Sequence, residues 1–250
     1  MNSHQQQIPK IIHQVWFSDK EPLPEVFKVL SDTWKHDYPD WKYILWNERN
    51  AEDFINEYYP QYKDLYNQFT YNIQRCDAIR YLFLYKMGGL YVDLDYESIR
   101  SIEPLIKGRT CCFSEESEKP ASKHKLFVPN LEHYFNNAMI FCMPNHPFMK
   151  KIIDSVFTNL NNLQSVNQCE YVMQTTGPWQ IMNLYAKLDN TEKQNVHIIP
   201  SKYVSPFTYE QSRRFLLGKE QSDELENCLQ EAYAVHYFFA SWTDEVKTDK

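Results

Sequence analysis

The sequence predicts an α/β fold, and the order of its apolar segments carries that prediction. Apolar runs typical of buried strands alternate with segments of helical periodicity along most of the chain. The clearest case is residues 72–86, where apolar side chains recur every three to four positions. Gly88 and Gly89 then end this helix, and an apolar strand follows at once over residues 90–92.

The remaining elements continue the alternation. The expected strands cover residues 11–17, 41–46, 90–92, 137–143, 197–199 and 232–236. The expected helices cover residues 24–34, 51–66, 72–86, 146–160 and 177–188. Pro24 and Pro178 lie at helix starts, where the fixed φ of proline is tolerated, and Pro60 divides the second helix into two pieces. We find no internal repeat, so we expect one domain over residues 1–250, with its core at 8–242 and a frayed tail at 243–250.

Composition excludes several classes of protein. The 43% apolar and 24% charged residues are typical of a globular chain, and the net charge of 26 − 33 = −7 argues against nucleic-acid binding. The sequence holds no apolar run of the roughly 20 residues that cross a bilayer, and its start lacks the pattern of a signal peptide. We therefore expect a cytoplasmic protein, with free thiols in or near the core rather than a zinc ribbon, because none of the 6 cysteines forms C-x-x-C.

Asp93 and Asp95 are the first candidates for chemistry. Residues i and i+2 of an extended chain face the same side, so two carboxylates would repel each other there unless a cation lay between them. This pair follows an apolar strand, and ligands of open α/β sheets bind at strand ends. An EF-hand is excluded, because its glycine and glutamate positions hold Ser98 and Pro104. A haloacid-dehalogenase-like phosphatase remains an alternative, although Glu97 stands where that family has Thr or Val.

Asp77 and Arg80 form a second candidate pair, one turn apart on the helix expected over residues 72–86. They fit either a surface ion pair or a site for hydroxyls and phosphate oxygens. Trp16 is most simply a core residue, and His13 is a satisfied core or surface histidine rather than a ligand. His236 alone is unremarkable. The aromatic fraction of 16% fits a core of large rings, or else a pocket for sugars in a non-catalytic binding module.

Taken together, these segments resemble one family. They are residues 8–16, 41–47, 76–81, 88–95, 136–138 with 145–147, 176–178, and His236 with Ser241 and Trp242. In this order they are similar to the glycosyltransferases with a DXD sugar-binding region (glycosyltransferase family 32). That group includes yeast initiating α-1,6-mannosyltransferases and bacterial capsule and lipopolysaccharide enzymes, and it is distantly similar to the glucosyltransferase domains of clostridial toxins. The resemblance implies a GT-A fold, a Rossmann-like mixed sheet flanked by helices.

The resemblance also implies how a nucleotide-sugar donor, with UDP favoured, would be held. Trp16 would stack on the base, and Trp242 would lie near the β-phosphate. Asp77 and Arg80 would hold hydroxyls of the sugar, and Asn137 would face it near the reacting carbon. Asp93 would contact ribose and sugar hydroxyls of the donor. The expected catalytic residues are Asp77, Arg80, Asp93 and Asn137.

For the metal, Mn²⁺ or Mg²⁺, the resemblance implies Asp95 as a ligand, Asp93 as a direct or water-mediated one, and His236 and Ser241 nearby. Toxins use an acidic group where this chain offers His236. The reaction implied is transfer of a hexose with retention. We favour front-face attack, because no catalytic nucleophile stands out.

The implied acceptor is a glycan or lipid-linked saccharide of polysaccharide or lipopolysaccharide synthesis, reached in the cytoplasm at the inner face of the membrane. Asp95→Ala is expected to abolish turnover and leave the fold intact, because it relieves repulsion between two carboxylates.

Overall fold

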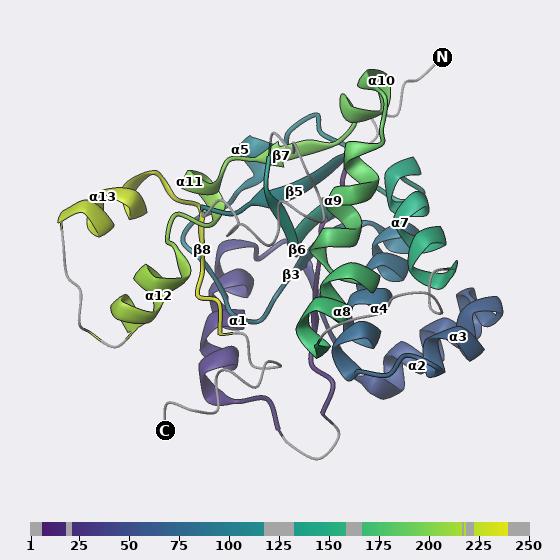
Figure 1. The fold of residues 1–250 in the computed structure, drawn as a ribbon. Coiled ribbons are helices and arrows are strands. Elements are labelled where there is room, and N and C mark those ends of the chain that lie inside the picture. Colours follow the sequence, from purple (N-terminus) through teal and green to yellow (C-terminus); the bar gives the residue numbers. More distant parts are fainter. Residues whose placement is uncertain are drawn as a thin grey trace.

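The computed structural model describes residues 7–18, 22–117, 133–158, 167–216, 218 and 223–239 (Figure 1). The strands are β1 (Ile11–Val15), β2 (Lys42–Trp46), β3 (Gly89–Val92), β4 (Tyr96–Ser98), β5 (Cys111–Glu115), β6 (Phe135–Cys142), β7 (His197–Ile199) and β8 (Ala234–His236). The longer helices are α1 (Glu25–Asp37), α2 (Glu48–Tyr58), α4 (Asn72–Met87), α7 (Pro147–Thr158), α8 (Gln168–Thr175), α9 (Pro178–Ala186), α12 (Tyr209–Leu216) and α13 (Asp223–Glu231). The short ones are η1 (Pro60–Tyr62), α3 (Lys63–Asn67), α5 (Glu103–Ile106), α10 (Asn190–Lys193) and α11 (Ser201–Val204).

Six of the described strands form one mixed sheet in the order β2-β1-β3-β6-β5-β7. β1 is parallel to β2 and β3, and β7 is parallel to β5. β6 lies between β3 and β5 and is antiparallel to both. β4 and β8 form a separate antiparallel ladder. The mixed sheet expected from the sequence is therefore confirmed.

Helices cover both faces of the sheet (Figure 1). α4 packs on β1, β3 and β6 and against α7, and α9 packs on β6. On the other side, α1 contacts β4, and α11 contacts β5 and β8. The alternation of side chains along β3 explains this division, since Tyr91 belongs to the core on the α4 side while Leu90 and Val92 join Trp34 of α1 on the other.

The helix predicted over residues 72–86 is α4, and it is buried on every side rather than on one face. Ala78, Ile79 and residues 81–84 are fully buried, and so, almost completely, are Asp77 and Arg80. A helix enclosed in this way is the central helix of a domain. Its polar side chains must therefore find partners inside the protein.

Glycine is required where α4 turns into β3. Gly88 and Gly89 have φ values of 68° and 108°, which side chains rarely adopt. A Cβ on Gly88 would lie 2.6 Å from Pro144 Cδ, and one on Gly89 would lie 2.5 Å from the backbone oxygen of Ile11. The tight turn delivers β3 directly beside β1.

Most predicted elements are confirmed within a few residues, including the break at Pro60. The sequence analysis missed β4, β5 and the helices α5, α8, α10, α11, α12 and α13. For β4, β5, α5, α10 and α11 the reason is length, because runs of three to five residues carry little periodicity. The helices α8, α12 and α13 have eight or nine residues and were missed as well. The cysteines are free; Cys111, Cys112 and Cys142 are in the core as expected, but Cys169 is exposed. The tail predicted at 243–250 lies outside the described residues.

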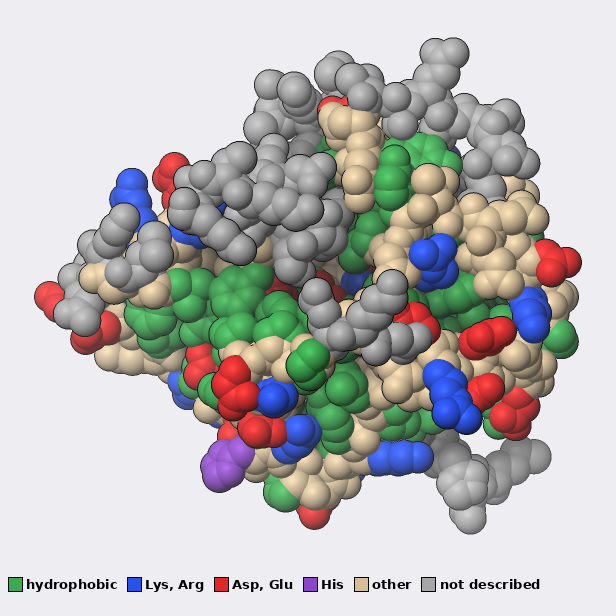
Figure 2. Space-filling view, turned by 90° about the horizontal axis from the view of Figure 1, so that it is seen from below, with side chains coloured by type: hydrophobic (Ala, Val, Ile, Leu, Met, Phe, Trp, Pro, Cys, Tyr) green, Lys and Arg blue, Asp and Glu red, His purple; other side chains and the backbone are tan. Residues whose placement is uncertain are grey.

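The surface seen in Figure 2 carries interspersed acidic and basic side chains on its described part. Among the described residues, the large exposed hydrophobic side chains are Val26 and Val29, one turn apart on α1, with Tyr58 of α2 and Leu216 of α12. In the described part of the chain, no helix combines the length and the apolar character that a bilayer crossing requires.

Candidate functional site

The D-x-D pair lies where β3 leaves the sheet. The backbone N–H of Asp93 donates to the carbonyl of Ala138 at 2.8 Å, which extends the ladder with β6 by one residue. The chain then turns, and the N–H of Tyr96 donates back to the carbonyl of Asp93 at 3.2 Å. Asp95 therefore lies in the turn between β3 and β4.

The β4–β8 ladder brings His236 to this turn. Tyr96 is the register partner of His236, and their rings stack with centroids 4.3 Å apart. Just beyond β8, the N–H of Tyr237 donates to the Asp95 carbonyl, and the N–H of Phe239 donates to Asp95 Oδ2, both at 2.9 Å. Asp95 is thus anchored on one oxygen and by its backbone.

Asp93, Asp95 and His236 each offer one ligand atom, and these atoms lie within 4.8 Å of one another. His236 Nε2 is 3.4 Å from Asp95 Oδ1, an ion-pair distance without hydrogen-bond geometry. Among the described residues, Asp95 Oδ1 and His236 Nδ1 are buried with no hydrogen-bond partner. Unsatisfied buried groups are costly, and carboxylate and imidazole donors suit a divalent cation. These three residues fit such an ion.

The two carboxylates differ in their electrostatics. Burial raises the pKa of Asp93 to about 6, against the opposing charge of Arg80, and the neighbouring Asp95 adds to the rise. Burial also acts to raise the pKa of Asp95, but the positive charge of His236 and the hydrogen bond from the Phe239 N–H outweigh it, so the net shift is downward. Asp95 therefore has a stabilising partner in the fold. The expectation that Asp95→Ala leaves the fold intact stays a prediction, and the variant would also lose this partner.

The pKa of His236 is raised for the reciprocal reason. Burial acts to lower it, but Asp95 and, more weakly, Asp93 favour the charged ring. A cation between the carboxylates would replace this positive charge. The ring is held ready for either role by its stacking on Tyr96.

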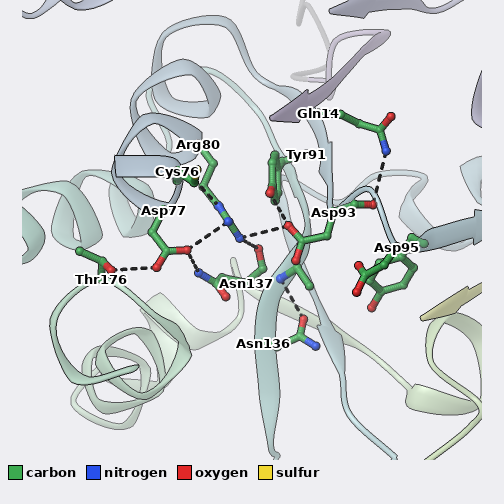
Figure 3. A network of polar contacts seen from close by, with 12 residues as sticks. Gln14, Cys76, Asp77, Arg80, Tyr91, Asp93, Asp95, Asn136, Asn137 and Thr176 are labelled. Atoms are coloured by element: carbon green, nitrogen blue, oxygen red, sulfur yellow. Dashed lines mark hydrogen bonds and ion pairs between the residues drawn. The ribbon is translucent and has the colours of Figure 1, made fainter. Parts of the chain in front are cut away.

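Arg80 joins α4 to the D-x-D pair (Figure 3). Its guanidinium lies 3.1 Å from Asp77 Oδ1 and 3.5 Å from Asp93 Oδ1, and it donates to the carbonyl of Asn137 at 2.8 Å. The side chains of Arg80 and Asp77 are only 4% and 5% exposed. The pair is therefore a buried ion pair inside the site, and the interpretation as a surface ion pair is wrong.

Asp77 and Asn137 lie side by side and are hydrogen-bonded to each other (Figure 3). Asn137 Nδ2 donates to Asp77 Oδ1 at 2.9 Å and to the Tyr81 hydroxyl at 2.7 Å. The Thr176 hydroxyl donates to Asp77 Oδ2 at 2.8 Å. Both carboxylate oxygens are occupied, so Asp77 is fixed in position.

Tyr91 supports the site from β3. Its hydroxyl donates a short hydrogen bond to Asp93 Oδ1, and its ring lies 4.3 Å from the Arg80 guanidinium carbon. Residues 91 and 93 face the same side of the strand, a spacing by which the sequence could have identified Tyr91. Thr176 belongs to the segment 176–178 of the resemblance, but its contact with Asp77 could not be predicted, because the two lie 99 residues apart.

Trp16 lies just after β1, where its backbone N–H donates to the backbone carbonyl of Trp46 at 2.8 Å. Its ring packs against Phe27 with centroids 5.7 Å apart, and Phe27 packs against Phe239, which binds Asp95. The structure thus places Trp16 at the same end of the sheet as the D-x-D pair. Ser241 and Trp242 lie outside the described residues.

Residues 24–112 match the family model described as the glycosyltransferase sugar-binding region containing a DXD motif. Over these residues, the chain is similar to this family. The matched region holds Asp77, Arg80, Asp93 and Asp95, so the resemblance drawn from the sequence motifs is confirmed.

Fungal mannosyltransferases are among the relatives. Inositol phosphoceramide mannosyltransferase 1 of Schizosaccharomyces pombe is 28% identical over 200 residues, which are 78% of this chain and 57% of that protein. A mannosyl phosphorylinositol ceramide synthase of Saccharomyces cerevisiae is 36% identical over 151 residues, 60% of this chain and 35% of that protein. The chain thus spans 35% to 57% of the length of these two relatives.

A solved structure shares the fold. The PaToxG glycosyltransferase superposes with a TM-score of 0.54 at 17% identity, over 91% of this chain and 89% of that one. At this identity the likeness concerns the fold alone. Together with the mixed sheet between two helical layers, it confirms the GT-A fold.

Proposed function

We propose that this protein is a glycosyltransferase that moves a hexose, with retention, from a nucleoside-diphosphate sugar to a saccharide hydroxyl. The observation that carries the proposal is the convergence of Asp93, Asp95 and His236 beside the buried Asp77–Arg80 pair. The family match over residues 24–112 favours this activity over the phosphatase and the non-catalytic sugar-binding module.

Asp93, Asp95 and His236 are the residues proposed to hold a divalent cation. Two carboxylates with one imidazole favour Mn²⁺ over Mg²⁺, because Mg²⁺ prefers a shell of oxygen atoms. When bound, the cation neutralises the diphosphate and makes it a better leaving group. The Phe239 N–H keeps Asp95 in place through Oδ2, which would leave its other oxygen, Oδ1, available to a cation.

The donor sugar is proposed to lie over Asp77, Arg80 and Asn137. Trp16 is proposed to contact the base, and Trp242 and Ser241, which lie outside the described residues, the phosphate and the metal respectively. Buried charged groups fixed by hydrogen bonds are preorganised to bind hydroxyls. Arg80 also lies within ion-pair distance of Asp93. Its guanidinium is therefore proposed both to bind a sugar hydroxyl and to offset the negative charge of the diphosphate.

Retention is proposed to follow because the acceptor oxygen attacks the anomeric carbon on the same face from which the leaving group departs. The acceptor oxygen bonds to the anomeric carbon as the bond to the diphosphate oxygen breaks, and that departing oxygen takes the acceptor proton. Asp77 is a poor candidate for a covalent nucleophile, because Arg80, Asn137 and Thr176 occupy its oxygens. Asp93 is likewise engaged by Tyr91 and Arg80.

The relatives guide the choice of substrates to test. Their names describe mannosyl transfer and phosphoinositol ceramide acceptors, so mannose and a lipid-linked acceptor are proposed first. Glycans of capsule or lipopolysaccharide type are the second acceptor class. UDP remains the predicted donor nucleotide, with GDP the alternative, and the location in the cytoplasm stays a prediction.

The test is release of nucleoside diphosphate from a panel of UDP- and GDP-hexoses, with Mn²⁺ or with chelator, in wild type and Asp95→Asn. The asparagine keeps an acceptor for the Phe239 N–H and removes the charge. We expect Mn²⁺-dependent turnover of one donor, reduced about 100-fold or more in the variant. Asp154→Asn, at an exposed residue of α7, is the matched control. Equal turnover in wild type and Asp95→Asn would contradict the proposal.

A further inference from the structure

Cys111 and Cys142 face each other across β5 and β6, away from the D-x-D pair. They are register partners, and both are fully buried. The N–H of Met143 donates to the carbonyl of Thr110 at 2.8 Å, so the flanking residues form the hydrogen-bonded pair. Cys111 and Cys142 are therefore a non-hydrogen-bonded pair, the type in which opposite Cα atoms are only about 4.5 Å apart and side chains are closest.

His146 completes a cluster with the two cysteines. One ligand atom of each residue lies within 4.8 Å of the others, and His146 is 3% exposed. Its Nδ1 accepts the N–H of Phe148 at 3.2 Å, at the start of α7. The proton of the neutral ring therefore lies on Nε2. The ring also hydrogen-bonds the Cys111 thiol.

This arrangement favours thiol chemistry over a metal site. A cation on Nε2 would displace the ring proton to Nδ1 and break the hydrogen bond from Phe148. A closed zinc site also takes four ligands, and the described residues supply three here. A disulfide needs only the two sulfurs, and Cα separations of about 4.4–6.8 Å allow it.

We propose that Cys111 and Cys142 are a modification site that forms an intrachain disulfide by exchange with a small-molecule disulfide such as oxidised glutathione. The Cys111 thiolate attacks one glutathione sulfur, which forms a mixed disulfide and releases one glutathione thiolate. The Cys142 thiolate then attacks the Cys111 sulfur and releases the second. Both protein thiols lose a proton, the two cysteines are oxidised, and oxidised glutathione is reduced to two glutathiones.

Access is from the start of β5. Residues 107–109 are exposed and Thr110 is half-buried, so the cysteine pair lies just inside an exposed turn. Burial raises the pKa of the Cys111 thiol, and the hydrogen bond with His146 opposes that rise only in part. Thiolate is the reactive form, so exchange is expected to be slow and to be helped by His146.

The test incubates the reduced full-length protein with oxidised glutathione, blocks remaining thiols with an alkylating agent and measures intact mass and cross-linked peptides without reductant. We expect 6 − 2 = 4 alkylated cysteines, from the 6 in the chain, and one cross-link joining Cys111 to Cys142. Reductant should restore all six. Melting should move to higher temperature in the oxidised protein, because the cross-link restrains the unfolded chain.

Matched variants decide the assignment. Cys111→Ala and Cys142→Ala should each abolish the cross-link, whereas Cys112→Ala, in the next residue on the opposite face of β5, should keep it. His146→Asn can keep the cap on Phe148 and should slow the reaction without changing its product. If a variant fails to fold, the wild-type peptide map still decides. Six alkylated cysteines after prolonged incubation, a cross-link through Cys112, or zinc retained by the reduced protein would each overturn the proposal.

Discussion

The side chains at this site hold one another in position. Arg80 is held by Asp77, Asp93 and the Asn137 carbonyl, and each contact limits where the guanidinium can lie. Removing one member of a buried ion pair costs about 3–5 kcal/mol, because the other charge is left without compensation. Asp77 and Arg80 are therefore poor positions at which to separate binding from folding.

Tyr91 offers a cleaner test at the scale of one atom. Tyr91→Phe keeps the ring under Arg80 and removes the hydroxyl that donates to Asp93. Loss of a hydrogen bond behind a metal ligand typically weakens metal binding about 10- to 100-fold. We expect the Mn²⁺ concentration for half-maximal turnover to rise by that factor, while the melting temperature changes little. Tyr233→Phe is the control, and an unchanged Mn²⁺ requirement in Tyr91→Phe would show that Asp93 does not depend on this bond.

At the residue scale, sequence analysis identified the charged residues better than their partners. Asp77, Arg80, Asp93 and Asp95 stand in recognisable spacings, and Tyr91 shares the strand face of Asp93. The contacts of Asp77 with Asn137 and Thr176 span 60 and 99 residues, and no local pattern encodes them. His236 entered only through the resemblance, because the ladder that brings it to Asp95 includes the unpredicted strand β4.

At the scale of elements, His13 fastens β1 to its neighbours. Its Nδ1 accepts the indole N–H of Trp46 on β2 at 3.1 Å, and its Nε2 donates to the Gly88 carbonyl at 2.9 Å. The ring stacks on Phe83 of α4, with centroids 4.4 Å apart. The sequence favoured a satisfied core or surface histidine here, and the structure places His13 in the core.

The same contacts predict a pH dependence. Burial, with a smaller effect from Lys42, outweighs the Gly88 hydrogen bond and lowers the pKa of His13 from 6.5 to about 4. Protonating Nδ1 would also oppose the Trp46 donor. The unfolded chain binds this proton more readily than the folded protein. The contribution of neutral His13 to the free energy of unfolding is therefore complete above pH 6.5 and is lost as pH falls towards about 4. It amounts to about 3 kcal/mol at most.

Urea unfolding of wild type and His13→Gln across this pH range measures the contribution. We expect the variant to be less stable near neutral pH, and the difference to shrink as pH falls. His36→Gln, at an exposed position of α1, should follow wild type throughout. A difference between wild type and His13→Gln that stays constant with pH would assign the acid sensitivity to other groups.

At the scale of the whole molecule, the central sheet assembles the site from distant segments. The turn after β3 supplies Asp93 and Asp95, α4 supplies Asp77 and Arg80, and β6 supplies Asn137. The α/β class could be predicted because apolar runs typical of strands alternate with long segments in which apolar residues recur at helical spacing. The separate β4–β8 ladder could not, since each strand has three residues and the two lie far apart in the chain.

We propose that Asp93, Asp95 and His236 hold a divalent cation to which a nucleoside diphosphate binds. The most direct measurement is thermal unfolding with UDP or GDP, each with Mn²⁺ or with chelator. For a ligand at about 100 times its Kd we expect about 2.7 kcal/mol of stabilisation, and a melting temperature raised by roughly 5–10 °C. The shift should require both Mn²⁺ and one nucleotide, and should be absent in Asp95→Asn but present in Asp154→Asn. An equal shift in Asp95→Asn, or none in folded wild type with either nucleotide, would contradict the account.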